Sequence, residues 1–224
     1  MHQRKSKKIL IYLFLLLIVG SINNVSLNNI RLKDIDNIKI VGLEERDNFI
    51  LLNQIKSLNL SNIFLIDGRK IEKKIVSNNL VENFFIFKRY PSSVDVNIET
   101  TKFLARINKN GKKFLVGSNG KLIEDNLSNN QLPFIFGTLD INEFLKLKNM
   151  IDQSKISYQE IKNLYFFSSK RWDIELKNNI LIKLSKNNTK ASLKLVLEFL
   201  HGNEFKDIKM IDARITNQII LNDW

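Results

Sequence analysis

The chain has 224 residues, a formal net charge of +12 and no cysteine. Its 44% hydrophobic content and 15 Phe allow a packed core, which excludes an intrinsically disordered chain. Without Cys there are no disulfides, thiol nucleophiles or cysteine metal clusters, and two His provide no His-pair metal site. We therefore expect no cofactor and no bound metal.

The N-terminal stretch combines positive charge with an apolar run. Four basic residues precede the uncharged run Ile9–Val19: Arg4, Lys5, Lys7 and Lys8. A helix from Ile9 to Leu27 would rise roughly 28 Å, close to the roughly 30 Å hydrocarbon thickness of a bilayer. The pattern predicts a cytoplasmic tail over 1–8, a transmembrane anchor over 9–27 and a tether over 28–37. The remainder would then be exported.

Two alternatives to an anchor stay open. A basic segment before a short apolar run is also typical of a cleaved signal peptide, and Val19-Gly20-Ser21 is a passable cleavage site that would remove residues 1–21. The third interpretation is a buried core helix. The anchor and the signal peptide both predict that residues after the apolar run work outside the cytoplasm.

The positive charge does not form a dense basic block. Four of the 35 Lys and Arg stand in the first eight residues, and the others are scattered among Asn and Ile. This distribution favours a solvated surface over a nucleic-acid site, so we expect no nucleic-acid partner.

The next segment predicts a small α+β domain over 38–107. Two helices between one strand and a strand pair can cover one face of a three-stranded sheet. The expected elements, in chain order, are a strand at Ile38–Gly42, a helix at Glu44–Leu58, an extended piece at Ile63–Ile66, a helix at Gly68–Asn78 capped by Asp67, and strands at Val81–Tyr90 and Val94–Glu99.

A second, mostly antiparallel β-domain with two helices is predicted over 108–224. Strand patterns alternate apolar and polar residues, and the turn Lys177-Asn178-Asn179 predicts a hairpin. The expected strands are Phe103–Ile107, leading out of the first domain, then Lys113–Gly117, Leu132–Gly137, Ile161–Phe167, Trp172–Leu176, Ile180–Leu184, Asp207–Arg214 and Ile215–Leu221; the helices are Leu139–Met150 and Lys190–Leu200.

Several short motifs in this order resemble the FtsQ/DivIB family of bacterial cell-division proteins, and the first domain resembles a POTRA domain. The motifs are Ile38-x-Ile40-x-Gly42, Asn62-x-Phe64-x-Ile66-Asp67, Phe87-Lys88-Arg89-Tyr90-Pro91-x-x-Val94-x-Val96-x-Ile98-Glu99 with Ala105 beyond, and Ile211-Asp212-x-Arg214. Two departures stand out. Gly117 occupies a position where the family often has Asp, and Thr216-Asn217 replaces the family's Pro-Asn or Pro-Asp.

The resemblance implies a non-catalytic scaffold of the division septum, in the inner membrane with a single span and a periplasmic bulk. Its partners would be division proteins of the FtsB/FtsL type, bound through the β-domain. A strand at the end of the chain is suited to binding by strand addition. The predicted partner-binding residues are Arg214, Thr216, Asn217, Gln218, Ile219, Ile220 and Leu221. Arg214 could pair with an acidic partner residue or with Asp212, and the last strand could lie at an edge or inside the sheet.

No catalytic motif appears in the sequence. There is no Gly-rich phosphate loop, nucleophile elbow or paired-carboxylate motif, and acids such as Glu72 and Glu175 are interpreted as solvated surface residues. We therefore expect no enzyme activity and no small-molecule substrate. The alternatives are a POTRA-bearing outer-membrane assembly or secretion factor and an exported enzyme with dispersed carboxylates.

Overall fold

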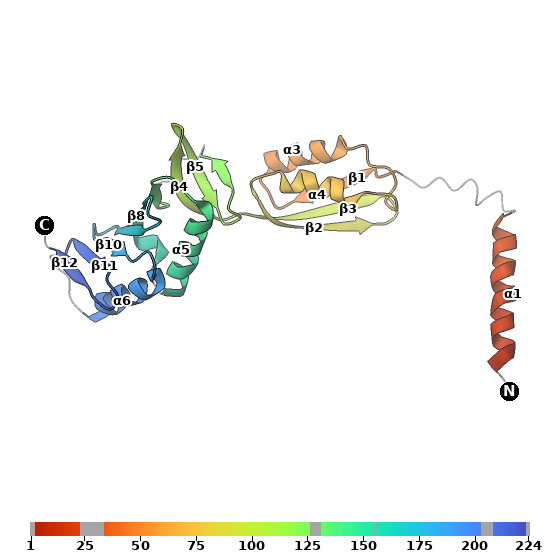
Figure 1. Ribbon diagram of the computed structural model, residues 1–224. Helices are drawn as coiled ribbons and strands as arrows, with labels where there is room; N and C mark the ends of the chain where they lie inside the picture. The colour runs from red at the N-terminus through yellow and green to blue at the C-terminus, as the bar shows by residue number, and fades with distance from the viewer. Residues whose placement is uncertain (1–2, 23–33, 126–130, 155, 203–207, 223–224) are drawn as a thin grey trace.

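A computed structural model describes residues 3–22, 34–125, 131–154, 156–202 and 208–222. They form an N-terminal helix followed by two folded units, which lie one after the other along the chain (Figure 1). We call residues 34–101 the first unit and residues 102–222 the second unit. Each has its own sheet and its own hydrophobic core. The predicted α+β class of the folded part is confirmed.

Helix α1 spans Gln3–Ile22 and includes the basic residues of the N-terminal stretch. Within the described ranges, no helix combines the length and apolar character needed to cross a membrane. The predicted transmembrane anchor over 9–27 is therefore wrong for these residues. Residues 23–27, on which that prediction also relied, lie outside the described part.

The first unit follows the predicted order of elements. It contains β1 (Asn37–Val41), α3 (Glu45–Lys56), α4 (Gly68–Val76), β2 (Val81–Arg89) and β3 (Ser93–Thr100). The sheet order is β1-β3-β2, with β1 parallel and β2 antiparallel to β3. Asp67 caps α4 as predicted, because its side chain accepts a hydrogen bond from the Arg69 amide at 3.1 Å.

The core of the first unit lies between its two helices and one face of the sheet. One buried cluster joins the helices to the inward-facing residues of the strands. The helices contribute Leu51 and Ile55 of α3 and Ile71 and Ile75 of α4. Burying one such side chain is worth about 1.5 to 3 kcal/mol. The extended piece expected at Ile63–Ile66 is not found, because Ile63–Leu65 form a turn, and Ile63 is the only one of the four residues that is buried.

The second unit is built on a nine-stranded mixed sheet with the order β12-β11-β10-β9-β8-β7-β4-β5-β6. Five of its strand pairs are antiparallel and three are parallel. The elements are β4 (Phe103–Lys109), β5 (Lys112–Gly117), β6 (Leu122–Glu124), β7 (Phe134–Phe136), α5 (Ile141–Ser154), a 3-10 turn (Tyr158–Glu160), β8 (Ile161–Phe166), β9 (Trp172–Leu176), β10 (Leu181–Leu184), α6 (Thr189–Gly202), β11 (Met210–Ala213) and β12 (Ile220–Asn222).

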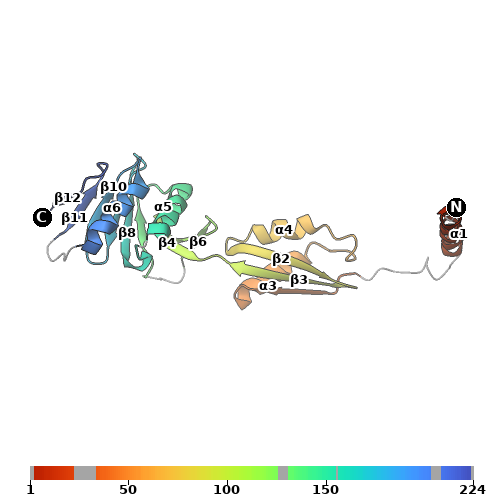
Figure 2. The same ribbon diagram turned by 90° about the horizontal axis from the view of Figure 1, so that it is seen from below.

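Helices α5 and α6 cover one face of this sheet (Figure 2). Phe144 and Leu147 of α5 and Leu193 and Val196 of α6 belong to the same buried cluster as Ile174, Ile182 and Ile211 of the strands. The opposite face carries the alternate residues of each strand and no helix of the described chain packs on it. No helix or further strand of the described chain packs on this uncovered face or pairs with the β12 edge.

Strand β4 belongs to the sheet of the second unit. It pairs with β5 and β7, and Ala105 and Ile107 are part of the second core. The sequence placed Phe103–Ile107 at the end of the first domain. We propose instead that the boundary between the units lies at Thr101 and Lys102.

The turn between β5 and β6 connects the two units through hydrogen bonds. The Asn119 side-chain amide donates to the carbonyl oxygens of Asn79 and Val81, both at 2.9 Å. Lys121 Nζ donates to the carbonyl oxygens of Val76 at 2.6 Å and Asn78 at 3.3 Å. Because Val76 ends α4, the lysine charge also lies at the negative end of the helix dipole.

Further contacts strengthen this junction. The Asn79 amide donates to the Leu122 carbonyl at 2.9 Å, and Ser118 Oγ donates to Glu82 at 2.7 Å. A Cβ on Gly117 would lie 2.6 Å from the Asn119 side-chain oxygen and 2.7 Å from Thr101 Oγ1. Glycine at 117 is therefore explained by close packing at the junction.

Candidate partner-binding edge

Strand β12 lies at one edge of the nine-stranded sheet, and β6 lies at the other. The three residues of β12 pair antiparallel with Met210–Asp212 of β11. The sequence left open whether the last strand was interior or at an edge. The strand order places it at the edge.

The strand is shorter than the sequence predicted. Ile215–Asn217 lie before it in a turn, in which the Gln218 amide donates to the Ile215 carbonyl at 3.3 Å. Asn217 has a positive φ of 59°, which Asn tolerates better than most residues. A turn therefore forms here without the proline that the family often has.

The side chains of β12 point to both faces of the sheet. Ile220 lies opposite Asp212, on the uncovered face, and Leu221 lies opposite Ile211, whose side chain faces the helices. Ile220 is 44% exposed and Leu221 is 41% exposed. Both are large apolar side chains that the second unit only partly covers.

Arg214 bonds to Asp212 within the chain. Its Nε donates to both carboxylate oxygens of Asp212 at 2.9 Å, and its backbone amide donates to Oδ1 at 3.1 Å. Burial works to raise the pKa of Asp212, but the hydrogen bonds from Arg214 outweigh it and lower the pKa of this carboxyl. The bond to Asp212, one of the two sequence alternatives for Arg214, is present.

A row of alternating charges continues from Asp212 across the uncovered face. Lys183 of β10 is in register with Asp212 on one side and with Asp173 of β9 on the other. Asp173 is buried and accepts a hydrogen bond from Arg171 Nε at 3.1 Å. Burial raises the pKa of Asp173, although the charges of Arg171 and Lys183 oppose this. The carboxylates are thus held between cations.

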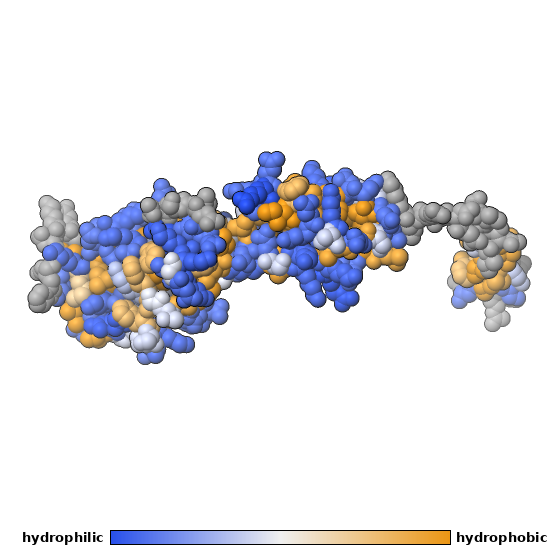
Figure 3. Space-filling model, turned by 90° about the horizontal axis from the view of Figure 1, so that it is seen from above, coloured by the Kyte–Doolittle hydropathy of each residue, from blue (hydrophilic) through white to orange (hydrophobic). Residues whose placement is uncertain are grey.

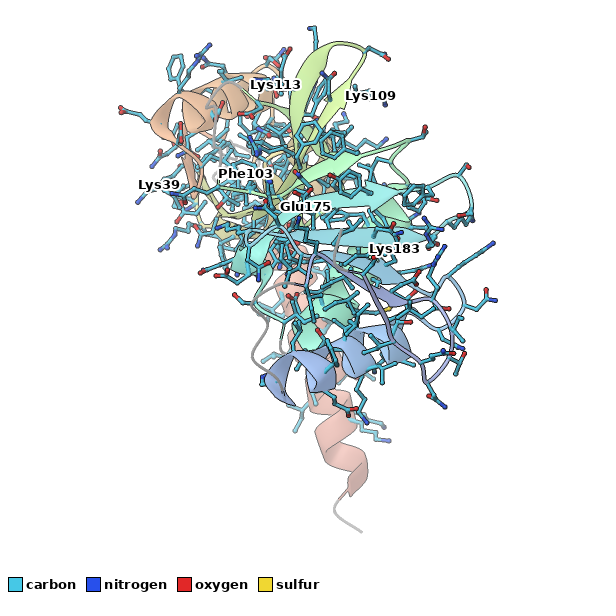
Figure 4. All side chains as sticks on the ribbon, turned by 90° about the vertical axis from the view of Figure 1, so that its left-hand side faces the viewer. Lys39, Phe103, Lys109, Lys113, Glu175 and Lys183 are labelled. Carbon is cyan, nitrogen blue, oxygen red and sulfur yellow. The ribbon has the colours of Figure 1, made fainter. Side chains whose placement is uncertain are left out.

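Glu175 forms a second polar group on the same face, on the strand next to Lys183 (Figure 4). Its carboxylate accepts hydrogen bonds from Lys162 Nζ at 2.8 Å, Asn163 Nδ2 at 2.9 Å and the Tyr165 hydroxyl at 2.6 Å. Burial opposes ionisation, but these donors lower the pKa of Glu175 to about 2. The interpretation of Glu175 as an isolated solvated acid is therefore wrong.

Aromatic side chains lie near the centre of the uncovered face, on and next to strands β7 and β8. The rings of Phe136 and Tyr165 stack with centroids 5.1 Å apart, and Phe134 contacts Phe136 at 4.7 Å. The Arg171 guanidinium lies 4.3 Å from the Phe167 ring centroid. Sequence reasoning did not include these residues or the charge row in the site. The alternation in Trp172–Leu176 was the available signal, because it already placed Asp173 and Glu175 opposite the core.

The predicted site residues do not form one continuous strand. Ile220 and Leu221 are in β12, Thr216 and Asn217 are in the turn, and Gln218 closes that turn. Thr216 Oγ1 accepts a hydrogen bond from Asn188 Nδ2 at 3.4 Å, and Ile219 packs partly against the core. No cluster of three or more His, Cys, Asp or Glu in the described ranges could hold a metal ion.

Comparisons with known proteins concern both the sequence and the structure of the chain. The model of the family "Cell division protein FtsQ/DivIB, C-terminal" matches residues 105–214, which fall within the second unit. The solved extracytoplasmic domain of DivIB from Geobacillus stearothermophilus is 10% identical, with a TM-score of 0.33 over 42% of this chain and 87% of that chain. That structural likeness is too low to support a shared fold.

Similarity to curated relatives extends over most of the chain. The cell division protein FtsQ of Rickettsia bellii is 22% identical over 204 residues, covering 85% of this chain and 72% of that protein. FtsQ of Rickettsia conorii is 22% identical over 203 residues, with coverages of 85% and 72%. The cell division protein DivIB of Clostridium tetani is 26% identical over 160 residues, covering 66% of this chain and 60% of that protein. The chain belongs to the FtsQ/DivIB family of cell-division proteins.

Proposed function

We propose that this protein is a non-catalytic scaffold of the division septum that binds other division proteins at the free edge of β12. Family membership supports the role in division. The edge position of β12 is the single observation that carries the binding mechanism. The partners expected from the family resemblance are proteins of the FtsB/FtsL type.

The backbone of β12 supplies the affinity in this proposal. One side of the strand pairs with β11, and the amide and carbonyl groups on the other side have no neighbouring strand in the described sheet. An extended partner segment can satisfy those groups by adding a tenth strand.

Side chains around the edge supply the selectivity. Ile220 and Leu221 offer apolar contact on the two faces of the added strand. The Arg214 side chain is 47% exposed while it bonds to Asp212, so it can also donate to an acidic residue of the partner. The turn residues Thr216, Asn217 and Gln218 border the strand end and limit how far a partner strand extends.

We further propose that both folded units work on the periplasmic side of the inner membrane at the septum, as the family resemblance implies. An alkaline phosphatase fusion after the last residue should be active in cells, because that enzyme folds only when exported. An inactive phosphatase fusion, together with an active cytoplasmic reporter at the same position, would contradict the location.

The binding mechanism is tested by proline substitution in β12. Alternate amides of an edge strand point away from the sheet, so either Ile220→Pro or Leu221→Pro removes an outward donor. That variant should keep its circular dichroism spectrum and lose its partner in co-purification. Asn222→Ala, which keeps every backbone amide, is the matched control and should bind normally. If both proline variants fold and bind normally, strand addition at β12 is wrong.

A further inference from the structure

The turn between α3 and α4 holds two large apolar side chains in a fixed outward position. Asn62 Oδ1 accepts hydrogen bonds from the amides of Phe64 at 3.2 Å and Leu65 at 3.1 Å. Ile63 is fully buried and anchors the turn to the first unit. The local hydrogen bonds and the buried anchor fix a backbone geometry that presents the next two residues to the surroundings.

These two side chains and a third form an exposed cluster. Leu65 is 73% exposed, Tyr90 is 63% exposed and Phe64 is 59% exposed. The ring centroids of Phe64 and Tyr90 lie 5.1 Å apart, so the turn after β2 meets the turn after α3. We call Phe64, Leu65 and Tyr90 the apolar tip. Grouped apolar side chains of this size mark an interaction surface, whereas single exposed ones do not.

The chain enters the first unit at this tip. Asp34 forms an isolated antiparallel bridge with Asn62, the residue that builds the turn. Helix α1 ends at Ile22, so the connecting residues can span at most about 40 Å between the helix and the tip. Helix α1 carries the exposed apolar run Ile9–Val19, and Figure 3 shows hydrophobic surface both on this helix and at the end of the first unit nearest the connecting trace. Two apolar surfaces are therefore tethered to each other.

We propose that the apolar tip inserts into the boundary between head groups and acyl chains of a lipid bilayer. Among its three residues the Tyr90 hydroxyl is the one hydrogen-bonding side-chain group, so the tip is apolar apart from one polar ring end. Tyr combines an apolar ring with a polar end and prefers this boundary. Arg69, in the first turn of α4, has a side chain that is 86% exposed and lies 3.5 Å from the Asp67 carboxylate, so its guanidinium can pair with Asp67 or with a lipid phosphate.

The proposal does not require a helix that crosses the bilayer, and it is independent of partner binding at β12. It concerns the opposite end of the folded part of the chain (Figure 1). A lipid contact at the tip would fix the first unit against the membrane surface and direct the second unit away from it.

The test uses the full-length chain, which has no native Cys and can carry one fluorescent label at a chosen position. The label is attached to Leu65→Cys, and the protein is mixed with vesicles of phosphatidylethanolamine and phosphatidylglycerol. We expect a blue shift of the emission and strong quenching by lipids that carry a spin label near the top of the acyl chain. The matched control is Phe85→Cys, which replaces an exposed aromatic residue of the same unit that lies away from the tip.

The outcomes separate the possible occupants of the tip. Shielding at 65 with a water-exposed label at 85 supports the proposal. A vesicle-bound protein whose label at 65 stays in water overturns it, because α1 alone then holds the chain on the lipid. Equal shielding at both positions indicates nonspecific adsorption and also overturns it. A blue shift at 65 without vesicles that grows with protein concentration assigns the tip to contact between copies.

Discussion

The second folded unit has a larger hydrophobic core than the first. Among the described residues, the core of the first unit has ten buried hydrophobic residues and that of the second has nineteen. The first unit nevertheless exposes more large hydrophobic side chains: Val41, Phe49, Ile50, Phe64, Leu65, Val76, Phe85, Phe87 and Tyr90, against Phe136, Phe167, Ile215, Ile220 and Leu221 in the second. A smaller domain has more surface for its volume. The first unit is therefore the one whose stability and surface depend most on contacts outside its own core.

The largest effect is expected from a substitution that disrupts only the core of the first unit. Ile55→Asp places an unpaired charge at a fully buried position and should cost several kcal/mol, enough to unfold this unit. Trp172 is buried in the second unit, and the first unit contains no Trp. We expect a partial loss of helical circular dichroism, from α3 and α4, while the Trp172 fluorescence remains native. Asn97→Asp, on an exposed strand position, should change stability by only about 0.5 kcal/mol.

If Ile55→Asp also abolishes the native Trp172 emission, the units fold as one cooperative body. The comparison between them would then concern only their surfaces. The reciprocal variant, Ile174→Asp in the second core, distinguishes the two cases further, because it should remove native emission in either case.

A smaller effect is expected at the junction. Lys121→Met keeps an apolar stem but removes the bonds to the Val76 and Asn78 carbonyls, and should lower the unfolding free energy of the first unit by about 1 to 2 kcal/mol. Spin labels at Lys56→Cys and Lys177→Cys should then report a broader distance distribution between the units. Lys112→Met removes an exposed pair with Glu124 in the same hairpin and should leave the distribution narrow.

The last pair of variants compares one carboxylate in each sheet. Glu175→Gln should destabilise the second unit by about 1 to 2 kcal/mol at neutral pH, because three side chains donate to the ionised group. The pKa of Glu175 is lowered to about 2 from 4.5, so the stability it contributes is present above pH 4.5 and is lost as the pH falls toward 2. Urea unfolding across that range should show the wild type and the variant converging.

In the first sheet, Asp95 pairs with Arg89, whose side chain is largely exposed. Asp95→Asn should therefore cost no more than about 1 kcal/mol. If Glu175→Gln and Asp95→Asn cost the same, the polar network on the uncovered face of the second sheet contributes no more than an exposed ion pair.

The amino-acid sequence determined the elements whose pattern is local. Alternation located β3, the spacing of Leu51 and Ile55 located α3, and Asp67 marked the start of α4, because each signal depends on residues within a few positions. The order of these elements also predicted the first sheet correctly. The motifs, together with Arg214 near the end, identified the family.

Only the tertiary structure decided which strands are neighbours when they lie far apart in the chain. Whether the last strand is interior or at an edge depends on pairing with β11, and the sequence pattern of Ile219–Leu221 is the same in both cases. The sequence alone made Glu175 look like a solvated acid. Its donors Lys162, Asn163 and Tyr165 come from strand β8, and only the pairing of β8 with β9 brings them to it. The assignment of β4 to the second sheet, the outward turn at Phe64 and Leu65 and the bonds of Lys121 to the first unit likewise depend on contacts between residues far apart in the chain, which local periodicity does not encode.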